Sequence, residues 1–188
     1  MKKLIKSYLA YAIIIINIIL IFVHQFIIND DYFNISSMSQ ELLNELPKGH
    51  IYTFYKYFFE LIETPIVQAI FLSLLFIIYI YVISLILLGI AKFTKCKVRF
   101  LKVTEAFVIS GSVVIIKKVF EIIYTLVNGQ VFESISVNFI FSLLQMIIYC
   151  VVIRFFVRSD KVNLIIYFGL IILGTLLING IIVALNTI

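Results

Sequence analysis

Residues 66–91 read IVQAIFLSLLFIIYIYVISLILLGIA, an apolar run without a charged side chain, and Pro65 precedes it. A helix needs roughly 20 mostly apolar residues to cross the hydrocarbon core of a bilayer, which is about 30 Å thick. Proline suits the first turn of a helix, because the amide hydrogen that it lacks would have no partner there. This stretch therefore predicts a helix that crosses a membrane.

Four further stretches have a similar length and character. They are residues 7–28, 106–127, 135–157 and 162–185. The third predicted span, 106–127, is the weakest, because three charged side chains interrupt it. None of the runs alternates as the strands of a membrane barrel would, and a helix satisfies its own backbone groups in lipid. We therefore predict an all-α polytopic membrane helix bundle with five transmembrane helices, forming one domain over residues 1–188.

The composition supports a membrane protein and argues against other classes. Of the 188 residues, 63% are hydrophobic and 13% are charged, and the mean hydropathy is +1.17. An ordinary soluble domain is roughly 45–50% apolar and about 25% charged, so this chain has too little polar surface to cover itself in water. The composition excludes a soluble catalytic domain, a disordered chain, a disulfide scaffold and a nucleic-acid-binding domain, despite the formal charge of +5.

The basic residues predict the orientation of the chain in the membrane. With the N-terminus inside, eleven of the fifteen basic residues fall on the cytoplasmic side, in residues 2–6, 92–102 and 154–161. Seven of the ten acidic residues then face outward. Cytoplasmic loops carry such an excess of lysine and arginine, so we expect a multi-pass protein of the cell membrane with a cytoplasmic N-terminus and an outer C-terminus. The first span is too long for the core of a cleaved signal peptide.

One large segment, residues 29–64, lies outside the predicted spans. Its second half, His50–Glu63, has helical spacing with an aromatic face and a polar face. The two faces consist of Ile51, Phe54, Tyr55, Phe58 and Ile62, and of Thr53, Lys56, Glu60 and Glu63. Such an outer amphipathic helix suits the membrane interface, where one face meets acyl chains and the other meets water. The alternative is a helix that packs against the bundle before the second span.

The histidines and cysteines do not form a catalytic or metal-binding pattern. His24 and His50 are predicted on the outer side, whereas Cys96 lies in the first cytoplasmic loop and Cys150 lies within the fourth span. A catalytic cysteine needs a base within hydrogen-bonding reach, which this topology forbids. No cluster has the spacing of a metal site, and a disulfide is not expected on the reducing side. We therefore predict a protein that is not an enzyme and has no cofactor.

Three ionisable residues, Lys117, Lys118 and Glu121, interrupt the third predicted span. Each lysine costs roughly 2.5–3.5 kcal/mol to insert at mid-bilayer, and Glu121 is spaced to pair with either one along a helix. The group could contact another subunit or a ligand headgroup. The alternative is a span that is kinked or shifted near Ser110–Ser112, so that these side chains extend to water at the membrane surface. Four other polar residues are expected to form interhelical hydrogen bonds. They are Asn17, Gln68, Gln145 and Asn179.

The basic, aromatic stretch Lys97–Phe107 leads into the small residues Ser110–Ser112. Together with five spans, a cytoplasmic N-terminus and an outer segment after the first span, this arrangement resembles the Yip1-type membrane proteins. The resemblance is architectural, so it implies no functional residues. It implies a role in vesicle traffic for eukaryotic members and a role as non-enzymatic accessory proteins, some beside ABC exporters, for bacterial ones. The composition, rich in Ile, Lys, Asn and Phe, suggests an AT-rich genome and a bacterial origin.

The function that we expect is that of a membrane accessory or scaffold subunit, which assists an exporter or gives resistance to a membrane-active peptide. The alternative is a small transporter or substrate-binding membrane component. The expected partners are the lipid bilayer and another membrane protein, such as a transporter subunit, and no nucleic acid. If the outer helix lies above the third span, its acidic face would offset the charge of the lysines. The candidate contact residues are then Lys117, Lys118, Glu121, Glu60 and Glu63.

Overall fold

The structure is a computed structural model. It describes residues 2–28, 42–45, 48–62, 64–129, 134–157 and 159–186. It is 88% helical, and the described residues contain no strand. The helices are α1 (Lys2–Ile28), α3 (His50–Ile62), α4 (Pro65–Phe93), α5 (Phe100–Ser110), α6 (Ser112–Asn128), α7 (Ile135–Ile153) and α8 (Lys161–Asn186). The predicted all-α fold is confirmed.

Four helices, α1, α4, α7 and α8, are long and apolar enough to cross a membrane. The segments concerned are Tyr8–Phe26, Pro65–Phe93, Ile135–Ile153 and Lys161–Leu185. Their mean hydropathy runs from 2.1 to 2.9, and at most 33% of any segment is buried inside the protein. Long apolar helices with so much apolar surface exposed need lipid around them, so the chain has the character of a multi-pass membrane protein.

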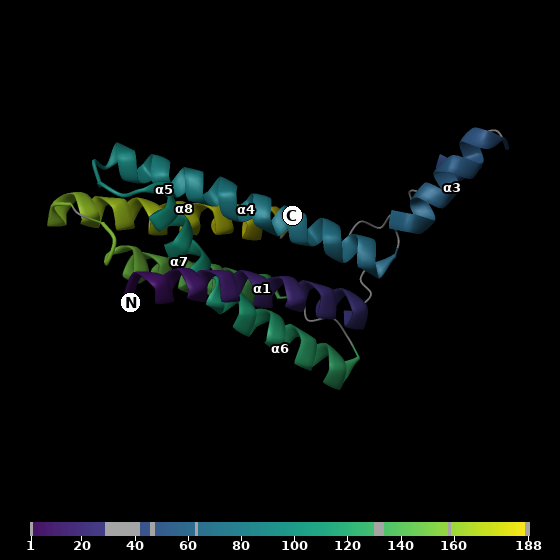
Figure 1. Cartoon of the computed structure of the whole chain (residues 1–188), viewed down its shortest axis with the longest axis horizontal. Coiled ribbons are helices and arrows are strands. Elements are labelled where there is room, and N and C mark those ends of the chain that lie inside the picture. Colours follow the sequence, from purple (N-terminus) through teal and green to yellow (C-terminus); the bar gives the residue numbers. More distant parts are fainter. Residues whose placement is uncertain are drawn as a thin grey trace.

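The four long helices lie along one common direction, which Figure 1 shows as the horizontal axis. Helix α5 packs among α1, α4 and α7, while α6 packs against α1 and α7. In the figure α6 leaves the bundle obliquely, so its end stands away from the neighbouring helices. Helix α3 projects from the end of the bundle where α4 begins, and among the described helices it contacts α4 alone. The core therefore lies around α5.

Helix α4 buries mainly small and polar side chains, together with Ile80 and Leu87, and exposes most of its large apolar ones. The buried set includes Gln68, Ala69, Ser73, Ser84 and Ala91. The exposed set includes Phe71, Leu75, Ile78, Tyr81 and Leu85. In lipid, large apolar side chains gain little by facing inward, whereas small residues let helix backbones approach closely. This distribution is the reverse of a soluble helix and is typical of a helix surrounded by lipid and other helices.

The third predicted span, 106–127, is not one continuous helix, and it divides near Ser110–Ser112, where a kink was one of the alternatives. The helix begins earlier, at Phe100, and divides at Gly111 into α5 and α6. The Ser110 hydroxyl donates to the Phe107 carbonyl at 2.6 Å, and the Gly111 amide donates to the carbonyls of Phe107 and Val108 at 3.1 and 3.0 Å. Serine hydroxyls compete in this way for helix carbonyls and bend helices.

Polar side chains link the helices inside the bundle. The Gln25 amide on α1 donates to the Gln68 side chain on α4. The Asn179 amide on α8 donates to the Ser142 hydroxyl on α7 at 3.2 Å. The predicted interhelical hydrogen bonds of Gln68 and Asn179 are therefore confirmed. The Asn17 amide instead donates to the Ile13 carbonyl of its own helix at 2.9 Å.

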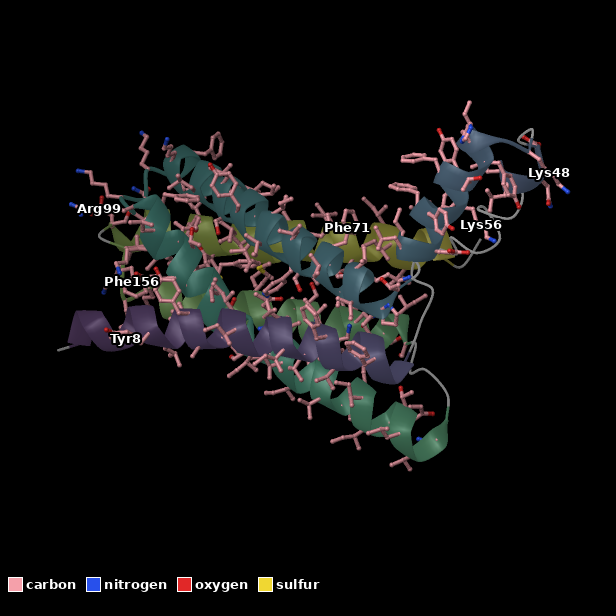
Figure 2. All side chains as sticks on the ribbon, turned by 45° about the vertical axis from the view of Figure 1, so that its right-hand side comes forward. Tyr8, Lys48, Lys56, Phe71, Arg99 and Phe156 are labelled. Carbon is pink, nitrogen blue, oxygen red and sulfur yellow. The ribbon has the colours of Figure 1, made fainter. Side chains whose placement is uncertain are left out.

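Segments rich in basic residues meet at one end of the bundle. The Cys96 thiol after α4 lies 3.5 Å from the Asn163 carbonyl at the start of α8. The Lys102 ammonium of α5 stands 5.2 Å from the centre of the Phe156 ring. Figure 2 shows Arg99 and Phe156 at this end, which is also where α1 begins in Figure 1. Basic segments that all face the cytoplasm must lie at the same end of the bundle, as these do. The side of the membrane that this end faces stays a prediction.

Candidate ligand site at the mid-depth of the bundle

The three ionisable residues of the third predicted span lie on α6, and the structure separates the roles of the two lysines. The Lys117 ammonium pairs with the Glu121 carboxylate at 3.1 Å. The side chains of this pair are 24% and 17% exposed. Among the described residues, no carboxylate lies within ion-pairing distance of Lys118. Lys117 therefore holds the direct ion pair with Glu121, and the Lys118 ammonium has no direct carboxylate partner among the described residues.

Lys118 lines a cavity of about 210 Å³ between α1, α4, α5, α6 and α7. The polar residues in its lining are Asn17, Tyr79, Lys118 and Gln145. The remaining lining is apolar except for Gly111, and it consists of Ile13, Phe76, Ile80, Phe107, Val108 and Val114. A mostly apolar hollow with a few convergent polar groups is the usual form of a small-molecule site. Lys118 thus faces the interior of the bundle.

The cavity lies at the mid-depth of the long helices. Asn17 is the central residue of the candidate span Tyr8–Phe26, and Tyr79 is the central residue of Pro65–Phe93. Gln145 is next to the centre of Ile135–Ile153. Three independent helices therefore bring their midpoints to one hollow, at the level where an inserted charge costs most. Ionisable residues at this depth are a hypothesis of function by default.

Asn17 carries a hydrogen-bonding group that its own fold does not satisfy. Its side chain is 1% exposed, and its amide nitrogen donates to Ile13 of the preceding turn. Its side-chain carbonyl oxygen, Oδ1, is buried and has no hydrogen-bond partner among the described residues. Leaving a buried acceptor without a partner costs about 1–3 kcal/mol. Asn17 thus lines the hollow and carries an acceptor that has no partner among the described residues.

The break at Gly111 shapes the cavity. Gly111, Val114 and Lys118 are spaced as neighbours on one face of a helix, and all three line the hollow. A Cβ added to Gly111 would lie 2.9 Å from the Val108 carbonyl oxygen, closer than real Cβ atoms come. The absence of a side chain therefore permits the close turn from α5 into α6. That turn directs the Lys118 face of α6 toward α1 and α4.

Glu60 of the outer segment does not join this site. Glu60 lies on α3, where it stands 3.9 Å from Lys56, and both side chains are more than half exposed. Helix α3 makes no contact with α6 among the described residues, and Figure 2 shows Lys56 on the helix that projects from the bundle. Glu63 lies outside the described residues. The structure thus brings together Lys117, Lys118 and Glu121 without Glu60.

Sequence reasoning gave too little weight to several residues of the cavity. Asn17 and Gln145 were expected only to link helices, Gly111 was noted only as part of the small-residue patch Ser110–Ser112, and Tyr79 was not singled out. For Asn17 and Tyr79, the sequence signal that could have indicated the site is their position at the centre of an apolar stretch. A polar residue at such a midpoint is a stronger indication of a site than one near a helix end.

The described residues contain no group of three histidine, cysteine or acidic side chains that could hold a metal ion. Cys96 and Cys150 are both buried and unbridged. Comparison with protein-family models, curated proteins and solved structures finds no match to this chain.

Proposed function

We propose that this protein is a non-enzymatic, multi-pass membrane component that binds a small molecule within its helix bundle, as a substrate-binding or transport subunit does. The observation that carries the proposal is the position of Lys118 in a mostly apolar hollow at mid-depth, which Asn17 with its unsatisfied buried oxygen also lines. A lysine in this position costs roughly 2.5–3.5 kcal/mol on insertion scales. A bound anion offsets that cost in a way that neighbouring apolar side chains do not.

The proposed topology has five crossings, and α5 and α6 together form the third of them as a broken span. In Figure 1 the chain enters α5 at the basic end of the bundle and leaves α6 near the opposite end. With 17 residues, α6 alone is about 25 Å long and falls short of the hydrocarbon core. Broken helices are tolerated at membrane depth where they are buried in protein or line a cavity. The basic end faces the cytoplasm in this proposal.

A second candidate function, an accessory or scaffold subunit beside another membrane protein, is favoured by α3. None of its residues is buried. Its exposed aromatic residues Phe54, Tyr57 and Phe58 lie on a helix that contacts only α4. This surface suits the membrane interface or a partner subunit, and the resemblance to Yip1-type accessory proteins points to the same role.

Native mass spectrometry of the protein extracted in mild detergent separates the two functions. The ligand-binding proposal predicts that the protein carries a small-molecule adduct from its membrane. The variant Lys118→Gln should lose the adduct, whereas the control variant Lys117→Gln/Glu121→Gln should keep it, because that pair lies outside the cavity lining. An adduct-free protein that co-purifies in fixed stoichiometry with another membrane protein would favour the accessory role and overturn the first proposal.

A further inference from the structure

We infer that the ligand of the cavity is a small aromatic carboxylate, whose ring lies among the aromatic side chains of the lining and whose carboxylate binds the Lys118 ammonium. This inference rests on the proposed function, because it names the class of ligand for the same cavity. Three properties of the lining lead to it: volume, aromatic content and charge.

The volume sets the size of the ligand. An apolar protein cavity of about 150 Å³ accepts benzene, whereas drug-sized ligands occupy about 300–1,000 Å³. The hollow beside Lys118 measures about 210 Å³. It therefore has space for one six-membered ring with one or two small substituents. A complete phospholipid or a long peptide is too large for it.

The aromatic lining favours a flat ring over a branched aliphatic body. Phe76, Tyr79 and Phe107 all line the cavity. The rings of Tyr79 and Phe107 have centroids 5.9 Å apart and are inclined by 56°. Aromatic rings prefer such inclined or offset contacts, which contribute about 0.5–1.5 kcal/mol beyond the burial of their surface. A third ring placed against this pair makes the same kind of contact.

The charge of the lining selects an anion. Of the described residues that line the cavity, only Lys118 carries a charge. The nearest acidic residue along α6, Glu121, is paired with Lys117 at 3.1 Å, and neither residue is part of the lining. A carboxylate in the cavity forms a charge-assisted hydrogen bond with an ammonium, which is about twice as strong as a neutral one. A cationic ligand would meet Lys118 without compensation.

The buried oxygen of Asn17 adds a second requirement. An anionic ligand that also carries a hydrogen-bond donor, such as a ring hydroxyl, supplies the partner that Oδ1 lacks. Gln145 in the same lining presents both a donor and an acceptor. We therefore expect a hydroxylated aromatic acid to bind more tightly than the unsubstituted acid.

The experiment compares three probes of nearly equal shape on the full-length protein in nanodiscs: benzoate, benzamide and benzylammonium. Binding is measured by equilibrium dialysis with radiolabelled compounds. Benzoate should bind at least about tenfold more tightly than benzamide, because a hydrogen bond to a charged group is the stronger one. Benzylammonium should not bind. Equal binding of all three probes, or preference for the cation, would overturn the inference.

Variants locate the effect in the cavity. Lys118→Gln should reduce benzoate affinity at least about tenfold, whereas Lys117→Gln/Glu121→Gln should leave it within a factor of about three. At least one of the three hydroxybenzoate isomers should bind more tightly than benzoate, and Asn17→Leu should remove that advantage. The comparison among probes uses the unaltered protein, so a variant that fails to fold does not decide the result.

The outcomes separate this inference from the function on which it rests. A protein that carries an endogenous adduct dependent on Lys118, yet binds none of the aromatic probes, has a different ligand class. In that case the inference is wrong and the proposed function stands. A protein with neither an adduct nor probe binding contradicts both.

Discussion

Removing the hydroxyl group of Tyr167 should weaken the attachment of α8 to the bundle. The hydroxyls of Tyr149 and Tyr167 lie 2.7 Å apart, and the Tyr167 hydroxyl donates to the Leu87 carbonyl of α4 at 3.3 Å. Both tyrosines are 0% exposed. The change Tyr167→Phe removes these bonds while the ring continues to fill its space, so the effect reports the hydroxyl alone.

The loss in the free energy of unfolding caused by Tyr167→Phe has two contributions. Interhelical hydrogen bonds in a membrane protein average about 0.6 kcal/mol, with a maximum of about 1.7 kcal/mol. In Tyr167→Phe, the Tyr149 hydroxyl also stays buried without its partner, and such a group costs about 1–3 kcal/mol. The free energy of unfolding should therefore fall by about 1–3 kcal/mol. The single variant Tyr149→Phe should give a smaller loss, because the Tyr167 hydroxyl keeps its bond to Leu87.

A double-mutant cycle measures the interaction energy between the hydroxyls of Tyr149 and Tyr167. The variant Tyr149→Phe/Tyr167→Phe leaves no orphaned hydroxyl, so it should be more stable than the sum of the single losses by about 1 kcal/mol. Reversible unfolding in bicelles, followed by circular dichroism, gives the four free energies. Tyr81→Phe is the control, because that side chain is 55% exposed, and it should be neutral. Strict additivity of the two single losses would refute the buried hydroxyl pair.

Three further predictions concern the site and the topology. Gly111→Ala should lower the stability by about 1–3 kcal/mol in thermal unfolding, because its Cβ meets the Val108 carbonyl at 2.9 Å, whereas the open position Gly89 should accept alanine without loss. Replacing Lys117 and Lys118 together with leucine should preserve or improve insertion in a glycosylation-mapping assay while abolishing ligand binding, and retained binding would exclude the cavity as the site. In intact cells, a tag at the N-terminus should be protected and a tag at the C-terminus should be exposed. Two tags on the same side would contradict five crossings, and an exposed N-terminus would contradict the proposed orientation.

Much of the fold follows from length and hydropathy, because lipid leaves the backbone few alternatives to a helix. The uncharged run after Pro65 becomes α4, and the amphipathic stretch from His50 becomes α3. Gln68 and Asn179 link helices as their polarity in an apolar setting suggests. These features depend on local sequence alone, so a single chain is enough to predict them.

The division at Gly111 and the difference between the two lysines depend on tertiary packing. A kink near Ser110–Ser112 was one of two alternatives that the sequence left open, and the division at Gly111 lies where α5 packs among α1, α4 and α7. Neighbouring residues on a helix point about 100° apart, so one of two adjacent lysines can face a cavity while the other pairs with Glu121. Sequence spacing allowed Glu121 to pair with either one.

The binding of a small aromatic acid beside Lys118 is tested most directly by a high-resolution experimental structure of the protein purified with the small molecules of its own membrane. Non-protein density of about one substituted ring is expected in the hollow, in contact with the Lys118 ammonium and Asn17 Oδ1. A collapsed hollow in which the Lys118 ammonium donates directly to Asn17 Oδ1, or a Lys118 side chain extended to the membrane surface, would contradict it.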